Sequence, residues 1–236
     1  MARNCVASID LNAIKKNYLY AKSLAPKSNA IAVIKGNAYG HGAIKVASHL
    51  ETSADCFGVA CIEEALDLTN AGILTVPILL LEGVFEESEL SLVDRNSFWM
   101  VVCNTAQIEW ILKSKPINKY DIFVKIDTGM GRLGFQEEDS IKVISALEKS
   151  NKVRKILYLF IGLLFRIHSI CAVLQTTIQK LFLSTKLSSD SSKTPSKSRM
   201  GAFKMPAFVK SNASSMHATP KQSADVSRWL ATLIAP

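Results

Sequence analysis

Short apolar runs alternate with helix-like segments along the first 150 residues, and this alternation limits the chain to a few folds. The runs are rich in branched side chains and lie at 31–35, 57–60, 76–82, 98–103 and 121–127, with a weaker sixth at 156–160. Near-continuous apolar runs of this length are typical of strands that are buried on both faces of a parallel sheet.

Three segments between these runs have helical features. Segment 8–25 repeats apolar residues at three- and four-residue steps, namely Leu11, Ile14, Tyr18 and Ala21. Segment 62–72 has acids in its first turn and Gly72 at its end. Segment 105–115 begins with Thr105 as a predicted N-cap. The alternation of predicted strands and helices along the chain predicts an α/β fold, either a barrel or a doubly wound sheet. An eight-stranded barrel typically needs about 250 residues, so a chain of 236 is short for one.

The sequence IAVIKGNAYGHGA, residues 31–43, places Lys35 as the last residue of the first predicted strand. Most strand-end lysines are solvated surface residues. Here the preceding run is fully apolar, and loss of hydration favours a neutral, nucleophilic amine. Three glycines allow tight turns and a close approach of a ligand. Tyr39 adds a phenol that could contact a phosphate. The spacing is neither GxxxxGK[ST] nor GxGxxG, so a nucleotide site is not supported.

A second glycine-rich segment, TGMGRLG at 128–134, follows Asp127 at the end of another predicted strand. Arg132 in this loop has two interpretations. It could clamp a carboxylate or a phenolate, or it could pair with Asp127 as a structural loop residue. In either parallel fold, chemistry occurs at the carboxyl ends of the strands. We therefore expect Lys35 and this loop to open onto the same face.

Charge and cysteine content restrict the function classes. Residues 1–150 carry 15 Lys/Arg and 18 Asp/Glu, whereas residues 151–236 carry 13 Lys/Arg and 2 Asp/Glu. This basic tail lacks arginine clusters interleaved with aromatics, so a nucleic-acid partner is not expected. The most apolar run, 156–165, is too short to span a bilayer, and no membrane partner is expected. Five scattered cysteines without CxxC or zinc-like spacing predict reduced thiols, no metal site and a cytoplasmic location.

Several segments together carry a family resemblance. AVIKGNAYGHG resembles the pyridoxal-phosphate lysine signature of bacterial alanine racemases, with Gly36 where alanine is more usual. KIDTGMGRLGF resembles the second characteristic segment of that family. SIDLNAIKKNY, FGVACIEEALDLTNAGI and PILLLEG are similar to its intervening blocks, in the correct order. The resemblance covers about residues 2–145 and implies a fold-type III enzyme with a TIM-type (β/α)8 barrel.

The resemblance implies a role for each candidate site residue. Lys35 would form the internal aldimine with pyridoxal 5'-phosphate and act as the base on the D-alanine side. Tyr39 would approach the cofactor phosphate. Arg132 would hydrogen-bond the phenolic oxygen of the cofactor and lie near the substrate carboxylate. Lys125 matches a lysine that can be carbamylated and orients that arginine. His41 is interpreted as a loop residue that makes turn contacts. The implied reaction interconverts L-alanine and D-alanine, for cell-wall peptidoglycan, in a homodimer.

The similarity fails after about residue 150. The rest of the barrel, a ring-stacking histidine, a phosphate cradle and a C-terminal β domain with a catalytic tyrosine are not readable. His168 and residues 211–215 are weak candidates for the first two, and Tyr158 is the last tyrosine. The break coincides with the change in charge. We therefore predict an incomplete barrel at 1–150 and a divergent basic tail at 151–236, with disorder at 187–199. A reading-frame shift near 150–160 is our hypothesis for the origin of the tail.

Three functions remain open at this point. The first is an alanine racemase, inactive if truncated. The second is a single-domain pyridoxal-phosphate-binding protein without racemase activity. The third is a basic nucleic-acid-binding module that depends only on the tail, for which strongly salt-dependent DNA binding would be the sign.

Overall fold

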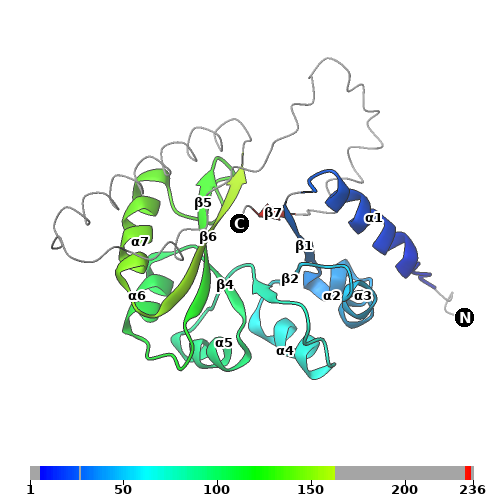
Figure 1. Ribbon diagram of the computed structural model, residues 1–236, viewed down its shortest axis with the longest axis horizontal. Coiled ribbons are helices and arrows are strands. Elements are labelled where there is room, and N and C mark those ends of the chain that lie inside the picture. The colour runs from blue at the N-terminus through cyan, green and yellow to red at the C-terminus, as the bar shows by residue number, and fades with distance from the viewer. Residues whose placement is uncertain (1–5, 27, 163–231, 235–236) are drawn as a thin grey trace, which may run out of the picture. The chain divides into compact units, whose positions relative to one another are not determined.

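The computed structural model describes residues 6–26, 28–162 and 232–234, which fall into two compact units (Figure 1). The first unit comprises residues up to 79 together with strand 232–234, and the second begins at residue 80. Each unit is described by itself below.

The first unit contains two parallel strands, the start of a third strand, one antiparallel strand and four helical segments. Its elements are α1 (Leu11–Ser23), β1 (Asn29–Val33), α2 (Lys35–Tyr39), α3 (Ala43–Leu50), β2 (Cys56–Val59), α4 (Ile62–Asn70), the start of β3 (Ile78–Leu80), and β7 (Thr232–Ile234). In β1 and β2, Ile31 pairs with Cys56 and Val33 with Gly58. Strand β7 pairs antiparallel with β1.

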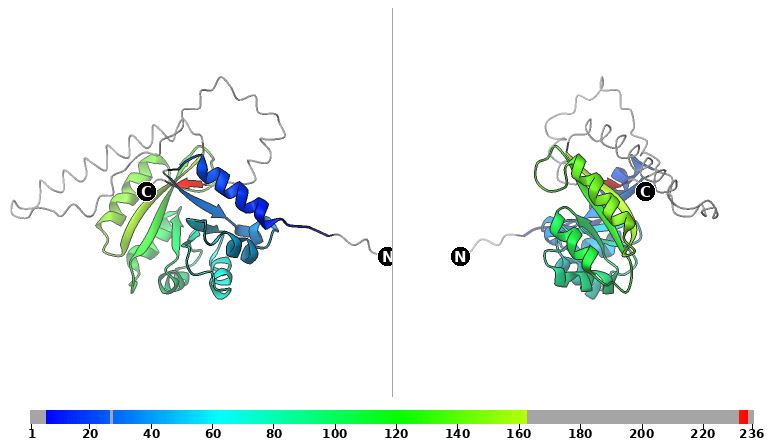
Figure 2. Two further views of the ribbon diagram at one scale, coloured as in Figure 1. Left: turned by 45° about the vertical axis from the view of Figure 1, so that its right-hand side comes forward. Right: turned by 90° about the vertical axis from the view of Figure 1, so that its left-hand side faces the viewer.

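The second unit is a run of parallel strands with helices between them. Its elements are η1 (Glu87–Glu89), α5 (Leu90–Asn96), β4 (Trp99–Val102), α6 (Thr105–Lys113), β5 (Tyr120–Thr128), α7 (Glu137–Lys149) and β6 (Val153–Gly162). Strand β5 pairs in parallel with β4 on one side and with β6 on the other. Helix α7 packs along β5 and β6, as two views of the ribbon agree (Figures 1 and 2).

The predicted strands are buried as their composition requires. All four residues of β2 are buried, and eight of the nine residues of β5 are buried. In the second unit the Trp99 and Phe123 rings pack with centroids 5.7 Å apart. Burial on both faces stabilises continuous apolar strands in parallel sheets. Parallel strands joined through helices in both units confirm the predicted α/β class.

All six predicted strands are present, but some predicted ends are wrong. Strand β1 ends at Val33, so Lys35 is not its last residue but the first residue of α2. Thr105 is not the N-cap of α6; that position belongs to Asn104, whose side chain accepts the Gln107 N–H. Helix α4 ends as predicted before Gly72, which has a φ of +87°.

The described residues include three cysteines, and their helices can be compared with the length that a membrane span needs. Cys56 and Cys103 are buried free thiols, and Cys61 is a half-buried one. Over the described ranges, no helix has the length and apolar character needed to cross a membrane.

Candidate functional site

Lys35 opens a short left-handed turn. Gly36, Asn37, Ala38 and Tyr39 all have φ between +53° and +60°. For residues other than glycine this conformation costs about 1–2 kcal/mol each. Strained backbone of this kind persists only where the surroundings fix it, and it concentrates at functional sites.

Hydrogen bonds hold this turn at both ends. The Ala38 N–H donates to the Ile34 carbonyl at 2.7 Å, and the Gly42 N–H donates to the Asn37 carbonyl at 2.9 Å. The Asn37 side chain also accepts the N–H of Ala43, the first residue of α3, at 2.8 Å. The turn is therefore joined to β1 on one side and to α3 on the other.

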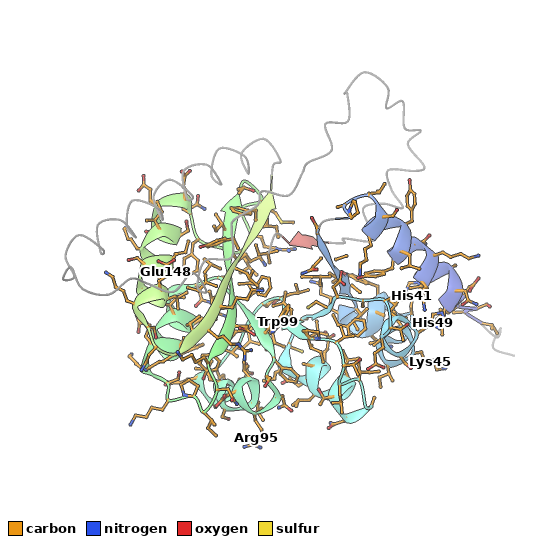
Figure 3. The ribbon with its side chains drawn as sticks, viewed as in Figure 1. His41, Lys45, His49, Arg95, Trp99 and Glu148 are labelled. Atoms are coloured by element: carbon orange, nitrogen blue, oxygen red, sulfur yellow. The ribbon has the colours of Figure 1, made fainter. Side chains whose placement is uncertain are left out.

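His41 lies beside α2 and α3 and makes the turn contacts expected of it (Figure 3). Its Nδ1 atom lies 2.8 Å from the Ala38 carbonyl, which also accepts the His41 backbone N–H at 3.0 Å. The second histidine of this region, His49, lies 3.1 Å from the Asn12 side-chain oxygen and connects α3 to α1. Both histidines have structural contacts.

The Lys35 side chain is half-buried, and Tyr39 is 50% exposed. Within the described residues, the Lys35 amine has no hydrogen bond or ion pair, and neither has the Tyr39 phenol. The turn therefore presents one amine and one phenol, four residues apart, whose polar atoms have no partner in the part of the chain that the structure describes.

Glu64 is a residue of this site that the sequence analysis did not identify. Its Oε1 atom accepts the N–H of Gly36 at 2.7 Å, and its Oε2 atom accepts the N–H of Ala60 at 2.8 Å. Glu64 lies in the first turn of α4, and Ala60 directly follows β2. One carboxylate thus joins the peptide after Lys35 to the end of the neighbouring strand. The only sequence signal for the role of Glu64 was its position three residues after Cys61, the N-cap of α4.

The glycine-rich loop in the second unit is organised by Asp127. Its carboxylate accepts the N–H groups of Gly129, Met130 and Gly131 at 2.8–3.1 Å. These donors, Gly129 and Gly131 first, lower the pKa of Asp127. In the described part of the chain, Arg132 is exposed and forms no ion pair with Asp127. The interpretation of Arg132 as the ion-pair partner of Asp127 is therefore wrong.

Lys125 is a buried lysine on β5, only 4% exposed. It is close enough to Cys103 for its positive charge to lower the pKa of that thiol, although burial has the larger, opposite effect and the pKa is raised overall. Cys103 follows the last residue of β4. A buried amine therefore lies near the carboxyl ends of β4 and β5.

The predicted site residues fall in both units. Lys35 and Tyr39 share one turn of the first unit, and Lys125 and Arg132 lie in the second. Their common face and their roles stay predictions. His168 and residues 211–215 lie outside the described residues. Among the described residues, no cluster of His, Cys, Asp and Glu could hold a metal ion.

Comparison with known proteins decides the family. A family model described as alanine racemase, N-terminal domain, matches residues 9–161, which is more than half of the chain. The chain belongs to the alanine racemase family. The match includes the Lys35 turn, Glu64, Lys125 and the Arg132 loop, and it continues through most of β6.

Curated relatives agree with this assignment. The alanine racemase of Chromohalobacter salexigens is 49% identical over 138 residues, which cover 58% of this chain and 38% of that protein. The catabolic alanine racemase of Pseudomonas aeruginosa is 47% identical over 150 residues, which cover 64% of this chain and 42% of that protein. This chain therefore spans about two-fifths of the length of these relatives.

Solved alanine racemases share the fold. The biosynthetic enzyme from Pseudomonas aeruginosa superposes with a TM-score of 0.63 at 37% identity, covering 66% of this chain and 43% of that one. The Bartonella henselae enzyme, solved with covalently bound pyridoxal phosphate, gives a TM-score of 0.54 at 33% identity. The superposition covers 64% of this chain and 43% of that one. The parallel strands thus belong to an incomplete TIM-type barrel and not to a doubly wound sheet.

Proposed function

We propose that this chain binds pyridoxal 5'-phosphate through Lys35 and acts on the α-proton of alanine. The observation that carries the proposal is the Lys35 turn: a half-buried amine without a partner in the described residues, on a strained turn fixed by Glu64 and Asn37, in a member of the alanine racemase family. The covalently bound cofactor of the Bartonella henselae enzyme supports the choice of ligand.

The polar groups of the site fit the chemistry of that cofactor. An aldehyde requires an amine that no carboxylate has already paired, and no carboxylate of the described residues pairs with Lys35. A phosphate accepts hydrogen bonds, and the exposed Tyr39 phenol can donate one. The phenolate oxygen of the cofactor requires a cation, and Arg132 is exposed and not paired with Asp127, whose carboxylate accepts backbone N–H groups.

Each residue then has a distinct role. When bound, the cofactor supplies the electron sink that stabilises negative charge at the α-carbon. The Lys35 amine accepts or returns the α-proton on the D-alanine side. Arg132 binds the cofactor oxygen and neutralises the substrate carboxylate. Lys125, if carbamylated, gains the negative charge that orients the Arg132 guanidinium.

Racemisation requires a second base on the opposite face of the substrate, because the proton must leave one face and return to the other. In this family that base is expected to be a tyrosine, and the sequence has none after Tyr158. We therefore propose half of the reaction for this chain by itself: exchange of the α-proton of D-alanine with solvent, without net formation of L-alanine.

Deuterium exchange tests this proposal directly. The chain is loaded with pyridoxal 5'-phosphate in heavy water, and the α-proton of D-alanine and of L-alanine is followed by NMR. We expect exchange of D-alanine that is lost in Lys35→Ala and retained in Lys45→Ala, a control at an exposed lysine of α3 (Figure 3). Equal exchange in the Lys35→Ala variant would contradict the role of Lys35.

A second candidate is a pyridoxal-phosphate-binding protein without racemase activity. It is favoured by the extent of the family match, which covers residues 9–161, with Lys35 and Arg132, and leaves out residues 162–236. The same experiment distinguishes it: cofactor would attach to Lys35, but neither enantiomer of alanine would exchange.

We also propose the finer properties that the family implies. These are participation in D-alanine biosynthesis, a cytoplasmic location and a homodimer. Equilibrium sedimentation of the cofactor-loaded chain tests the dimer, because a dimer has twice the 25.8 kDa mass of one chain.

For the tail, we propose that a reading-frame shift near residues 150–160 separates a racemase-like part at 1–150 from a basic segment at 151–236. The family match ends at residue 161, and the last 86 residues contain only Asp190 and Asp225 as acids. Sequencing the coding DNA and translating the other frames tests this. A frame that restores a ring-stacking histidine and a tyrosine-bearing β domain would support the proposal, and its absence would oppose it.

A further inference from the structure

We propose that Glu64 is a positioning residue for Lys35. The inference rests on the proposed function of Lys35 as the cofactor-binding amine. It follows from one contact, in which the Glu64 carboxylate accepts the N–H of Gly36 at 2.7 Å. That N–H belongs to the peptide bond directly after Lys35. Fixing this peptide plane restricts ψ of Lys35, and so restricts how the Lys35 Cα–Cβ bond is oriented relative to the rest of the turn.

The contact is rigid because the other oxygen of Glu64 is also engaged. Oε2 accepts the N–H of Ala60 at 2.8 Å, within four residues of Glu64 in sequence. Ala60 directly follows β2, and β2 is paired with β1. Just after the last residue of β1, the Ile34 N–H also donates to the Gly58 carbonyl of β2 at 2.8 Å. The backbone before Lys35 is therefore bonded to β2 itself, and the peptide after it is bonded to Glu64, which holds the residue after β2.

The strain of the turn explains why such a contact is needed. Asn37, Ala38 and Tyr39 have positive φ without being glycine. Their conformation is less stable than a right-handed one. A carboxylate that accepts two backbone N–H groups forms charge-assisted bonds, which are about twice as strong as neutral ones. Glu64 thus opposes relaxation of the segment that carries both Lys35 and Tyr39.

The test compares two variants with a matched control. Glu64→Gln keeps the shape but replaces one acceptor oxygen by an NH2 group that cannot accept a backbone N–H. Glu64→Ala removes both acceptors. Glu63→Gln removes an exposed negative charge from the same first turn of α4 and so controls for the helix dipole.

The first readout does not use the cofactor. Hydrogen exchange of the Gly36 amide is measured in the full chain and compared with the Phe57 amide in β2. We expect Gly36 to exchange about tenfold faster in both Glu64 variants, as loss of one hydrogen bond to a charged group predicts. Phe57 should be unchanged, whereas a merely structural role would accelerate both amides. Unchanged exchange at Gly36 would overturn the proposal.

The second readout is attachment of pyridoxal 5'-phosphate to Lys35, trapped by borohydride and located by peptide mass. We expect half-saturation at about tenfold higher cofactor concentration in the Glu64 variants and no change in Glu63→Gln. Wild-type affinity in Glu64→Gln would overturn the proposal. If the wild-type chain itself attaches no cofactor at Lys35, the proposed function fails, and the Gly36 exchange alone decides whether Glu64 positions the turn.

Discussion

Gln107 holds in α6 the position that Glu64 holds in α4, the third residue of the helix. Each side chain accepts the backbone N–H of the residue four places before it, at 2.8 Å in both cases. That residue is Ala60 for Glu64 and Cys103 for Gln107, and each directly follows a strand. The two units therefore use the same local device to close the connection between strand and helix.

The remaining polar atom of each side chain explains why one residue is an acid and the other an amide. Glu64 faces an N–H group, that of Gly36, and a carboxylate oxygen accepts it. Gln107 faces two carbonyl groups, those of Glu82 and Val84, and its NH2 group donates to both at 2.9 Å. The residue type thus matches the groups that it faces, an N–H after β1 for Glu64 and two carbonyls after β3 for Gln107.

Gln107→Glu should destabilise the second unit strongly at neutral pH. Gln107 is 2% exposed, and the new carboxylate would place a charged oxygen against two carbonyl oxygens. We expect a loss of about 3 kcal/mol in the free energy of unfolding, measured by urea denaturation. The loss should shrink in acid, because a protonated carboxyl can donate again. Glu109→Gln, on the exposed side of the same helix, should change stability by less than about 0.5 kcal/mol. Equal effects of the two substitutions would contradict this account.

Asp127→Asn should weaken the glycine-rich loop in a pH-dependent way. The N–H groups of Gly129 and Gly131 lower the pKa of Asp127 below its ordinary value of 3.8. A lowered pKa means that the ionised carboxylate stabilises the fold. This contribution is present above the ordinary value and is lost as pH falls through the lower folded value. The difference in unfolding free energy between wild type and variant should therefore be constant near neutral pH and disappear in strong acid.

The control for Asp127 is Asp139→Asn, which removes an exposed carboxylate paired with Lys142 at 3.1 Å. Unfolding of this variant should follow the wild type across the same pH range, because exposed ion pairs contribute little. A flat difference between wild type and Asp127→Asn at all pH values would show that the carboxylate charge does not hold the loop.

The sequence was sufficient for some parts of the site and not for others. Strands such as 57–60 could be predicted because burial on both faces leaves a continuous apolar run. Lys35 and Arg132 could be named as candidates because each lies in a long motif after such a run, and their roles stay predictions. The left-handed turn could not, since only one of its four residues is a glycine and positive φ at Ala38 depends on distant contacts. The bond from Glu64 to Gly36 crosses 28 residues, and no local pattern indicates it.

Among the helices that the sequence analysis did not predict, α7 and α3 have sequences that carried signals. Helix α7 begins with three acids in its first turn and ends at Lys149, as a helix stabilised by its dipole would. Helix α3 has an apolar stripe that includes Val46, Ala47 and Leu50, all buried. These elements were predictable from periodicity, whereas the position of the strand end before Lys35 depended on tertiary hydrogen bonds.

Gly36→Ala should be tolerated. Gly36 has a φ of +60°, which costs an alanine about 1 kcal/mol, but an added Cβ would have no atom within 4 Å. We expect a small loss of stability and retained attachment of the cofactor to Lys35. Gly83→Ala is the contrasting control, also at positive φ, where the Cβ would lie 2.2 Å from the Val101 carbonyl oxygen. Thermal unfolding should show a much larger loss for Gly83→Ala, and a similar loss in both variants would contradict the open space at Gly36.

Tyr18→Phe should remove a buried connection between α1 and the first two strands. The Tyr18 hydroxyl donates to the Ala30 carbonyl at 2.8 Å and accepts the Asp55 N–H at 3.2 Å. Without it, two backbone groups lose a partner, and we expect a loss of about 1–3 kcal/mol in the free energy of unfolding. Tyr20→Phe is the matched control, because Tyr20 lies on the same helix but is 68% exposed.

The pH dependence of this effect has a defined sign. Burial raises the pKa of Tyr18 from 10.0 to about 12. The protonated phenol therefore stabilises the fold below the ordinary value, and this contribution is lost as pH rises through the folded value. Urea unfolding above pH 10 should show that the wild-type chain loses stability more steeply than Tyr18→Phe, while Tyr20→Phe follows the wild type. Parallel curves for wild type and Tyr18→Phe in alkali would show that the phenol is not held in its neutral, hydrogen-bonded form.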